Sequence, residues 1–150
     1  MLIYMAPEAD MFKSDADAWV NTVNCKGVMG GGIALLFKQK FPQMYLDYRN
    51  KCNIGIIKPG TVNTYANDDG SPNFILNLAT KDDYRNPSEL EWIKDGVFDL
   101  LCTVRQFRIQ KVALPALGCG LGGLNFEDVK AIYEKYLASS DCIFEVYSPR

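Results

Sequence analysis

Two glycine-rich stretches carry the residues that could do chemistry. The first, at 24–32, reads Asn-Cys-Lys-Gly-Val-Met-Gly-Gly-Gly, and the second, at 118–123, reads Gly-Cys-Gly-Leu-Gly-Gly. Glycine has no Cβ, so it lets the backbone approach a ligand closely. Each run precedes an amphipathic segment, and the first N–H groups of a helix suit a phosphate. Two such loops could hold the two phosphates of one dinucleotide-like ligand.

Three interpretations of these glycine runs compete. A Walker A loop needs Gly-Lys-Ser/Thr after its spacer, and neither run has it. A Rossmann fingerprint follows the first strand of a sheet, whereas the run at 118–123 follows a late one. The third interpretation is that the glycines only make tight turns. Because both runs lie between an apolar strand and a helix, we favour phosphate binding.

The composition excludes several kinds of catalytic site. The chain has no histidine, which removes the commonest general base, the usual partner of a nucleophilic Ser or Cys, and the commonest transition-metal ligand. The five cysteines are odd in number and none is spaced as C-x-x-C, so neither a disulfide framework nor a zinc site is indicated. Chemistry here must use Lys, Asp, Asn, backbone amides and water, and we expect no metal and no separate cofactor.

Net charge and length limit the expected partners, location and domain number of the protein. The net charge is −2, from 16 basic and 18 acidic side chains, so the chain as a whole attracts neither nucleic acid nor an anionic membrane. The start has no basic region and no long apolar run, so we expect no signal peptide, no membrane association and a cytoplasmic location. A chain of 150 residues fits one domain, 1–150, and we expect a monomer.

The hydrophobic pattern predicts strands that alternate with helices. We expect strands at 2–5, 18–22, 61–66, 74–79, 111–114 and 142–147, with a hairpin between the third and fourth, and helices after the first glycine run to about Lys40, from Pro42, after Ser88 and after Asn125. Ser88 lies three residues before Glu91, a capping-box spacing, and Asn125 can cap the last helix. These elements predict an α/β fold whose mixed sheet is covered on both faces. Ligands in such sheets gather outside the carboxyl ends of the strands.

Three motifs give the chain a family resemblance. Val-Asn-Thr-Val-Asn at 20–24, Gly-Val-Met-Gly-Gly-Gly-Ile-Ala at 27–34 and Ala-Leu-Pro-Ala-Leu-Gly-Cys-Gly at 113–120 together resemble a macrodomain, the module that binds ADP-ribose. The resemblance implies a three-layer α/β/α fold. Leu-Ala-Thr-Lys at 78–81 is similar to the branch that contains human terminal ADP-ribose glycohydrolase and the macrodomain of the DarG antitoxin. Members of that branch remove ADP-ribose from acidic side chains or from thymine bases in DNA.

The resemblance also implies a set of ligand-binding residues. Asp10 would accept the adenine amino group, Asn24 would orient the distal ribose, and Tyr147 would lie against the adenine. The remaining members of the set are Met11, Gly30, Gly31, Gly32, Ile33, Thr80, Gly118, Cys119, Gly120, Leu121 and Gly122. Structural roles stay open for several of these residues: Asp10 as an N-cap, Asn24 in an Asx turn, Cys119 as a small packed thiol, and Tyr147 as a core aromatic.

Lys81 is the catalytic candidate, with Asn24 positioning the ribose. In the relatives, this lysine faces the anomeric carbon of the distal ribose, where it could attack as an amine or stabilise a departing group as an ammonium. The alternative is a surface lysine paired with Asp82 or Asp83.

The second loop departs from the human enzyme, which carries a catalytic aspartate where this chain has Gly122. We therefore favour thymidine-linked ADP-ribose on DNA over Glu or Asp esters on protein, with Lys81, Tyr84 and Arg85 as the exposed rim that meets DNA. The same rim residues also fit an ordinary solvated turn. Two rival functions remain open, an ADP-ribose 1″-phosphate phosphatase and a reader that binds ADP-ribose without turnover.

Overall fold

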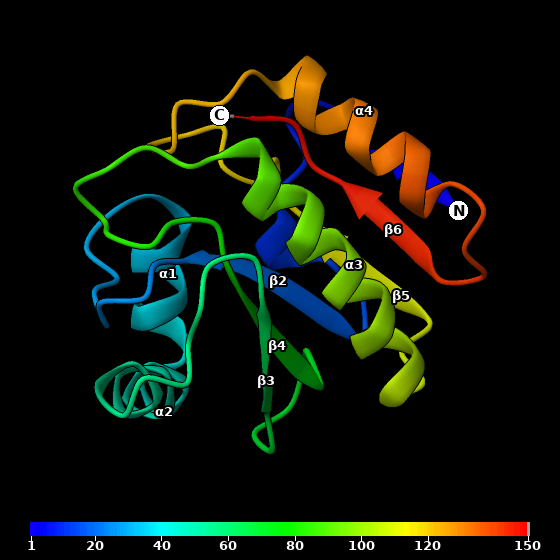
Figure 1. The fold of residues 1–150 in the computed structure, drawn as a ribbon. Coiled ribbons are helices and arrows are strands. Elements are labelled where there is room, and N and C mark those ends of the chain that lie inside the picture. Colours follow the sequence, from blue (N-terminus) through cyan, green and yellow to red (C-terminus); the bar gives the residue numbers. More distant parts are fainter. Residues whose placement is uncertain (150) are drawn as a thin grey trace.

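The computed structural model describes residues 1–149 and has an α/β architecture (Figure 1). Its elements, in chain order, are β1 (Leu2–Tyr4), the short 3-10 helix η1 (Met11–Lys13), β2 (Ala18–Val23), α1 (Gly32–Lys40), α2 (Pro42–Asn53), β3 (Val62–Ala66), β4 (Phe74–Ala79), α3 (Leu90–Gln106), β5 (Lys111–Leu114), α4 (Phe126–Leu137) and β6 (Ile143–Val146). The alternation of strands and helices predicted from the sequence is confirmed, with shifts of one or two residues at several ends.

The strands of residues 1–149 form a single mixed sheet in the order β1-β6-β5-β2-β4-β3. All neighbouring strands are parallel except β3 and β4, which pair antiparallel as the predicted hairpin. The central strand β2 lies between β4 and β5, so the segments that follow these strands meet at one edge of the sheet.

Helices cover both faces of the sheet, which gives the three layers visible in Figure 1. Alternate residues of β2 point to opposite faces: Val20 joins the core under α3 and α4, while Trp19 joins the core under α1 and α2. Burial on both faces explains why these strands read as continuous apolar runs.

Gly96 lies in the middle of α3, where a glycine is unfavourable for a helix. A Cβ at this position would stand 2.6 Å from Cδ2 of Leu78, so the glycine permits α3 to approach β4 closely. Its cost in helix propensity is about 1 kcal/mol, and the close packing of α3 on the sheet depends on it.

The predicted capping box at the start of α3 is wrong. The helix begins at Leu90 with Glu89 as its N-cap, and the buried Oγ of Ser88 has no hydrogen-bond partner among the described residues. The backbone N–H of Ser88 instead donates to the carbonyl of Gly122 at 3.0 Å. The tertiary contact with the second glycine loop therefore overrides the local capping pattern. Asn125 does cap α4 as predicted, because its side chain accepts the N–H of Glu127 at 2.8 Å.

Within residues 1–149, no helix is both long enough and apolar enough to span a membrane.

Candidate active site

A cavity of about 790 Å³ lies at the carboxyl ends of the central strands. Its walls come from the segments that follow β2 (22–36), β4 (80–84), β5 (115–122) and β6 (147–149), together with η1 and its flanks (9–13). This is the place where open α/β sheets bind ligands, and the volume lies in the range of small-molecule sites.

The side chain of Asn24 stabilises the first glycine loop by hydrogen bonds to the backbone of that loop. Its Oδ1 accepts the N–H of Lys26 at 2.9 Å, and its Nδ2 donates to the carbonyl of Val28 at 2.7 Å. The buried hydroxyl of Tyr48, on α2, donates to the carbonyl of Asn24 at 2.7 Å. Asn24 lines the cavity and is 7% exposed. The Asx-turn role is therefore present in the structure, and Tyr48 supports it from behind.

The first glycine run ends this loop and begins α1. Gly32 has φ +57°, a backbone conformation that favours glycine, and Gly31 is the extended N-cap of α1. Gly30, Gly31, Gly32 and Ile33 all line the cavity. The first N–H groups of a helix have no partner within it. The positive end of α1 therefore lies at the cavity wall.

The second glycine run faces the first across the cavity. Leu121 is 76% exposed, and its side chain extends toward the first glycine run. If Gly31 carried a Cβ, that atom would lie 3.2 Å from Cδ1 of Leu121. Gly118 and Gly123 have φ of +73° and +78°. A Cβ on Gly122 would collide with both the carbonyl oxygen of Gly118 and Oγ of Ser88. The loop as folded therefore has no room for a side chain, and hence no carboxylate, at position 122.

Unlike Gly118, Gly120, Leu121 and Gly122 of the same loop, Cys119 is not among the residues that line the cavity. Its thiol donates to the carbonyl of Leu117 at 3.5 Å, and its side chain packs against the core under α3 and α4. Burial raises the pKa of this thiol to about 11. Both observations describe a packed thiol rather than a nucleophile.

Lys81 lies at the end of β4, where the backbone continues the pairing with β2. The N–H groups of Thr80 and Lys81 donate to the carbonyl of Val23 at 3.0 and 3.4 Å. The Lys81 Nζ donates to two backbone carbonyls, of Tyr84 at 3.3 Å and of Leu121 at 3.2 Å. The amine therefore joins the 81–85 turn to the second glycine loop at the cavity wall.

Within the described part of the chain, the acidic neighbours of Lys81 form no ion pair with it. Asp83 forms a two-pronged pair with Arg85, Nη2 to Oδ2 at 2.7 Å and Nε to Oδ1 at 3.0 Å. These hydrogen bonds hold the pKa of the Asp83 carboxyl well below its usual range. None of the ion pairs among residues 1–149 involves Lys81. The interpretation of Lys81 as the partner of Asp82 or Asp83 is therefore wrong.

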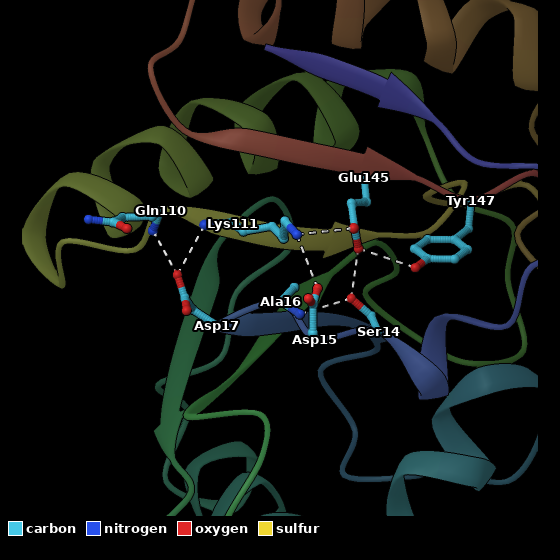
Figure 2. Close-up of polar contacts among 8 residues, drawn as sticks. All are labelled: Ser14, Asp15, Ala16, Asp17, Gln110, Lys111, Glu145 and Tyr147. Atoms are coloured by element: carbon cyan, nitrogen blue, oxygen red, sulfur yellow. Dashed lines mark hydrogen bonds and ion pairs between the residues drawn. The ribbon is translucent and has the colours of Figure 1, made fainter.

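The far end of the cavity is formed by η1 and the segment after β6. Asp10 is the N-cap of η1 and accepts the N–H of Phe12 at 3.0 Å, and the next residue, Met11, is 5% exposed. Tyr147, 6% exposed, lines the cavity while its hydroxyl donates to Oε1 of Glu145 at 3.2 Å (Figure 2). Burial raises the pKa of this phenol. Tyr147 thus serves the core and the cavity at once.

Except for Cys119, the residues predicted to bind a ligand all line this one cavity. The wall also contains residues that the sequence does not single out for it: Phe12, Val28, Leu36, Lys40, Pro115, Ala116, Ser148 and Pro149. Their nearness to the glycine loops in sequence is the signal that could have found most of them. No such signal marks three residues outside the cavity lining that hydrogen-bond to it or to its supports: Tyr48, which bonds to Asn24, Glu145, which bonds to Tyr147, and Ser14, which bonds to Glu145. The described residues contain no group of three or more Cys, Asp or Glu side chains that could hold a metal ion.

Comparisons with known proteins agree with this architecture. The model of the Macro domain family matches residues 20–133. The chain is 44% identical over 124 residues to the DNA ADP-ribosyl glycohydrolase of Mycobacterium tuberculosis, a match that covers 81% of this chain and 35% of that protein. The chain thus spans about a third of the length of this curated relative.

Two solved structures are similar over almost the whole chain. The macrodomain of Thermus aquaticus DarG superimposes with a TM-score of 0.92 at 36% identity, covering 99% of both chains. Thermosipho africanus DarTG, solved in complex with ADP-ribose, gives a TM-score of 0.88 at 30% identity, over 95% of this chain and 40% of that one.

Proposed function

The chain belongs to the macrodomain family, and from that premise we propose that it is an ADP-ribosyl glycohydrolase. It binds ADP-ribose that is attached to a macromolecule and hydrolyses the bond at C1″ of the distal ribose. Thymidine-linked ADP-ribose on DNA is the favoured substrate over Glu or Asp esters on protein. The observation that carries this proposal is that one cavity holds both glycine loops and, at its wall, Lys81.

The order of the strands supports one direction for the bound nucleotide in this proposal. Tyr147 follows β6 and Lys81 follows β4, and β5 and β2 lie between them. Three strand spacings amount to about 14 Å. Adenine then lies between Asp10 and Tyr147, the diphosphate lies between the two glycine loops, and the distal ribose reaches Lys81.

The two glycine loops suit a diphosphate for physical reasons. The N-terminal end of α1 carries a partial positive charge and N–H donors, which favour an anion. Gly30, Gly31 and Gly32 let the phosphate oxygens approach this backbone without meeting a Cβ. Leu121 reaches toward Gly31 from the opposite loop and covers the ligand.

Lys81 acts at the bond that breaks. A water oxygen bonds to C1″ as the bond from C1″ to the base nitrogen breaks, and the electron pair of that bond moves onto the base. The proton released by the water ends on the base, so the products are ADP-ribose and an intact thymine. The ammonium of Lys81, held by the carbonyls of Tyr84 and Leu121, stabilises the negative charge that develops on the base.

Two features favour DNA as the macromolecule. The second loop has no room at position 122 for a carboxylic acid that could donate a proton to the leaving group, and thymine spreads negative charge over its carbonyls. Next to Lys81, Tyr84 is 47% exposed and lines the cavity, with the guanidinium of Arg85 5.4 Å from its ring centre. An exposed aromatic ring of this kind can stack on a base, and a guanidinium can meet a phosphate.

The test offers three substrates to the wild type and to Lys81→Ala. They are an oligonucleotide with thymidine-linked ADP-ribose, a protein with Glu-linked ADP-ribose, and ADP-ribose 1″-phosphate. We expect the wild type to release ADP-ribose fastest from the oligonucleotide, and Lys81→Ala to lower kcat about 100-fold or more. Lys135→Ala, on the exposed side of α4, is the matched control and should retain full activity.

The remaining outcomes identify the rival functions. Release of inorganic phosphate alone would make the protein a phosphatase, and tight ADP-ribose binding with no product from any substrate would make it a reader. Unchanged cleavage by Lys81→Ala would overturn the role of the lysine.

A second variant separates the two roles of the amine. Lys81→Arg keeps a positive charge but removes the nucleophile, so measurable activity in it supports charge stabilisation. A ribose–lysine adduct trapped on the wild type by borohydride and found by mass spectrometry would instead establish covalent attack.

A further inference from the structure

Glu145 is a buried carboxylate that the proposed reaction does not use. It lies on β6 between Phe144 and Val146, which both point into the core under α3 and α4, so its side chain leaves the opposite face of the sheet. It is 8% exposed and is not among the residues that line the cavity. A carboxylate in such a place is costly unless several donors satisfy it, which raises the question of what its donors are.

Two hydroxyl groups and one ammonium satisfy Glu145 (Figure 2). Its Oε1 accepts from Oγ of Ser14 at 2.7 Å and from the hydroxyl of Tyr147 at 3.2 Å. Its Oε2 lies 3.7 Å from Nζ of Lys111, which has a closer partner in the exposed Asp15 at 3.1 Å. The ion pair with Lys111 is long, and Lys111 also pairs with Asp15. The hydroxyl groups of Ser14 and Tyr147 are therefore the main hydrogen-bond donors to Glu145.

These two hydroxyls belong to segments on both sides of the same end of the cavity. Ser14 ends η1, where its N–H donates to the carbonyl of Met11 at 3.1 Å, and η1 presents Asp10 and Met11 to the cavity. Tyr147 begins the segment 147–149, which also lines the cavity. Ser14 and Glu145 are 131 residues apart in the chain, so a single oxygen atom fixes two distant segments relative to each other.

We propose that Glu145 is a positioning residue, which sets the width of the adenosine end of the site by holding Ser14 and Tyr147 on one carboxylate oxygen. This inference rests on the proposed function, because it assigns that end of the cavity to adenine. Lys81 acts about three strands away from this end. Loss of Glu145 therefore weakens nucleotide binding and leaves the chemical step intact.

The test separates affinity from turnover. ADP-ribose binding is measured by calorimetry, and KM and kcat are measured with the preferred ADP-ribosylated substrate. We expect Glu145→Ala to raise Kd and KM about tenfold and to change kcat less than about twofold. Glu145→Gln keeps an oxygen acceptor for both hydroxyls and should bind within about twofold of the wild type.

Glu134 provides a matched control, because its Oε1 accepts the hydroxyl of Tyr4 at 2.8 Å at the edge of the sheet. Glu134→Ala removes a similar tyrosine–glutamate contact that is outside the cavity and should leave Kd unchanged. An equal loss of affinity in Glu134→Ala and Glu145→Ala would overturn the proposal.

The coupling between residues gives an independent measurement. If Glu145 acts through Ser14 and Tyr147, then Ser14→Ala and Tyr147→Phe weaken binding in the wild type but add little in a Glu145→Ala background. If Glu145→Ala does not fold, Ser14→Ala carries the test, because Ser14 contacts Glu145 and is not among the residues that line the cavity: it should raise Kd and KM and leave kcat within about twofold, and an unchanged Kd would refute the role of Glu145.

The failures of the two proposals are distinct. A wild type that does not bind ADP-ribose would refute the proposed function. A wild type that binds, with Glu145→Ala binding equally well or losing kcat rather than affinity, would refute the role of Glu145 alone.

Discussion

A single glycine decides which chemical groups the second loop can offer. The place where a Cβ of Gly122 would stand is taken by the carbonyl oxygen of Gly118 and by Oγ of Ser88. The packing of the loop therefore excludes any side chain at position 122. The proposed catalysis must therefore rely on groups outside position 122, and Lys81 is a cation that contacts the loop, through the carbonyl of Leu121.

Gly122→Ala tests this packing without any ligand. We expect the free energy of unfolding to fall by about 1–3 kcal/mol, since the added Cβ must displace backbone. Gly120→Ala is the control in the same loop, because a Cβ there meets nothing within 4 Å, and it should be neutral or stabilising by up to about 1 kcal/mol. Urea unfolding compares the two variants, and equal stabilities would contradict the crowding at position 122.

Cysteine reactivity gives a second prediction for single residues. Burial raises the pKa of Cys119 and of Cys142 to about 11, whereas Cys102 is exposed on α3. At neutral pH we expect iodoacetamide to modify Cys102 first, because the thiolate is the reacting form and the partly buried Cys119 and the buried Cys142 hold their protons. Labelling of Cys119 should rise about tenfold per pH unit up to its pKa.

Peptide mass spectrometry over a range of pH measures this order. If Cys119 reacted as fast as Cys102 at pH 7, its thiol would be activated, and the nucleophile interpretation would return.

Among the elements, α3 and α4 begin in different ways. Asn125 caps α4 with its side chain, whereas the hydroxyl of Ser88 before α3 is buried without a partner among the described residues. We expect Asn125→Ala to lower the free energy of unfolding by about 1 kcal/mol. Ser88→Ala should cost nothing and can stabilise the fold, since it removes an unsatisfied polar group. Thermal unfolding of the two variants checks this, and a loss in Ser88→Ala equal to that in Asn125→Ala would restore the capping box.

The same pair of residues shows how far the sequence predicts the elements. The cap at Asn125 is a contact with Glu127, two residues away, so a local pattern suffices to find it. The N–H of Ser88 is taken by Gly122, and that contact exists only once the fold has brought the second loop to the start of α3. The apolar runs predicted the strands for a related reason, because burial on both faces leaves its mark within each strand.

The residues of the candidate site likewise fall into those found from local sequence motifs and those whose partners are distant in the chain. The glycine runs and the Thr80–Lys81 turn are contiguous motifs, so the sequence predicted the cavity walls. The residues that hold those walls have distant partners: Tyr48 supports Asn24, and Glu145 joins Ser14 to Tyr147. Strand alternation places Glu145 opposite Phe144 and Val146, but no local pattern shows that its face is buried there.

For the whole molecule, one rigid sheet holds loops that are otherwise independent. The walls of the cavity follow β2, β4, β5 and β6, which are neighbours in the sheet. In the proposed binding mode, strand spacing therefore sets the distances between the subsites for the base, the diphosphate and the distal ribose. Since the net charge is −2, binding of an anionic nucleotide depends on these local donors rather than on long-range attraction.

A ligand that bridges these loops must stabilise the whole fold. At 100 times its Kd, ADP-ribose adds about 2.7 kcal/mol to the free energy of unfolding, which corresponds to a rise in Tm of roughly 5–10 °C for a domain of this size. Inorganic phosphate at the same concentration should give no comparable rise, because it occupies only the glycine loops. Lys81→Ala should keep the shift produced by ADP-ribose, since the proposed role of the amine is to stabilise the departing base and not to bind the nucleotide. Differential scanning fluorimetry measures both shifts, and a variant that lost the shift together with turnover would show that Lys81 binds the nucleotide rather than acting on the bond.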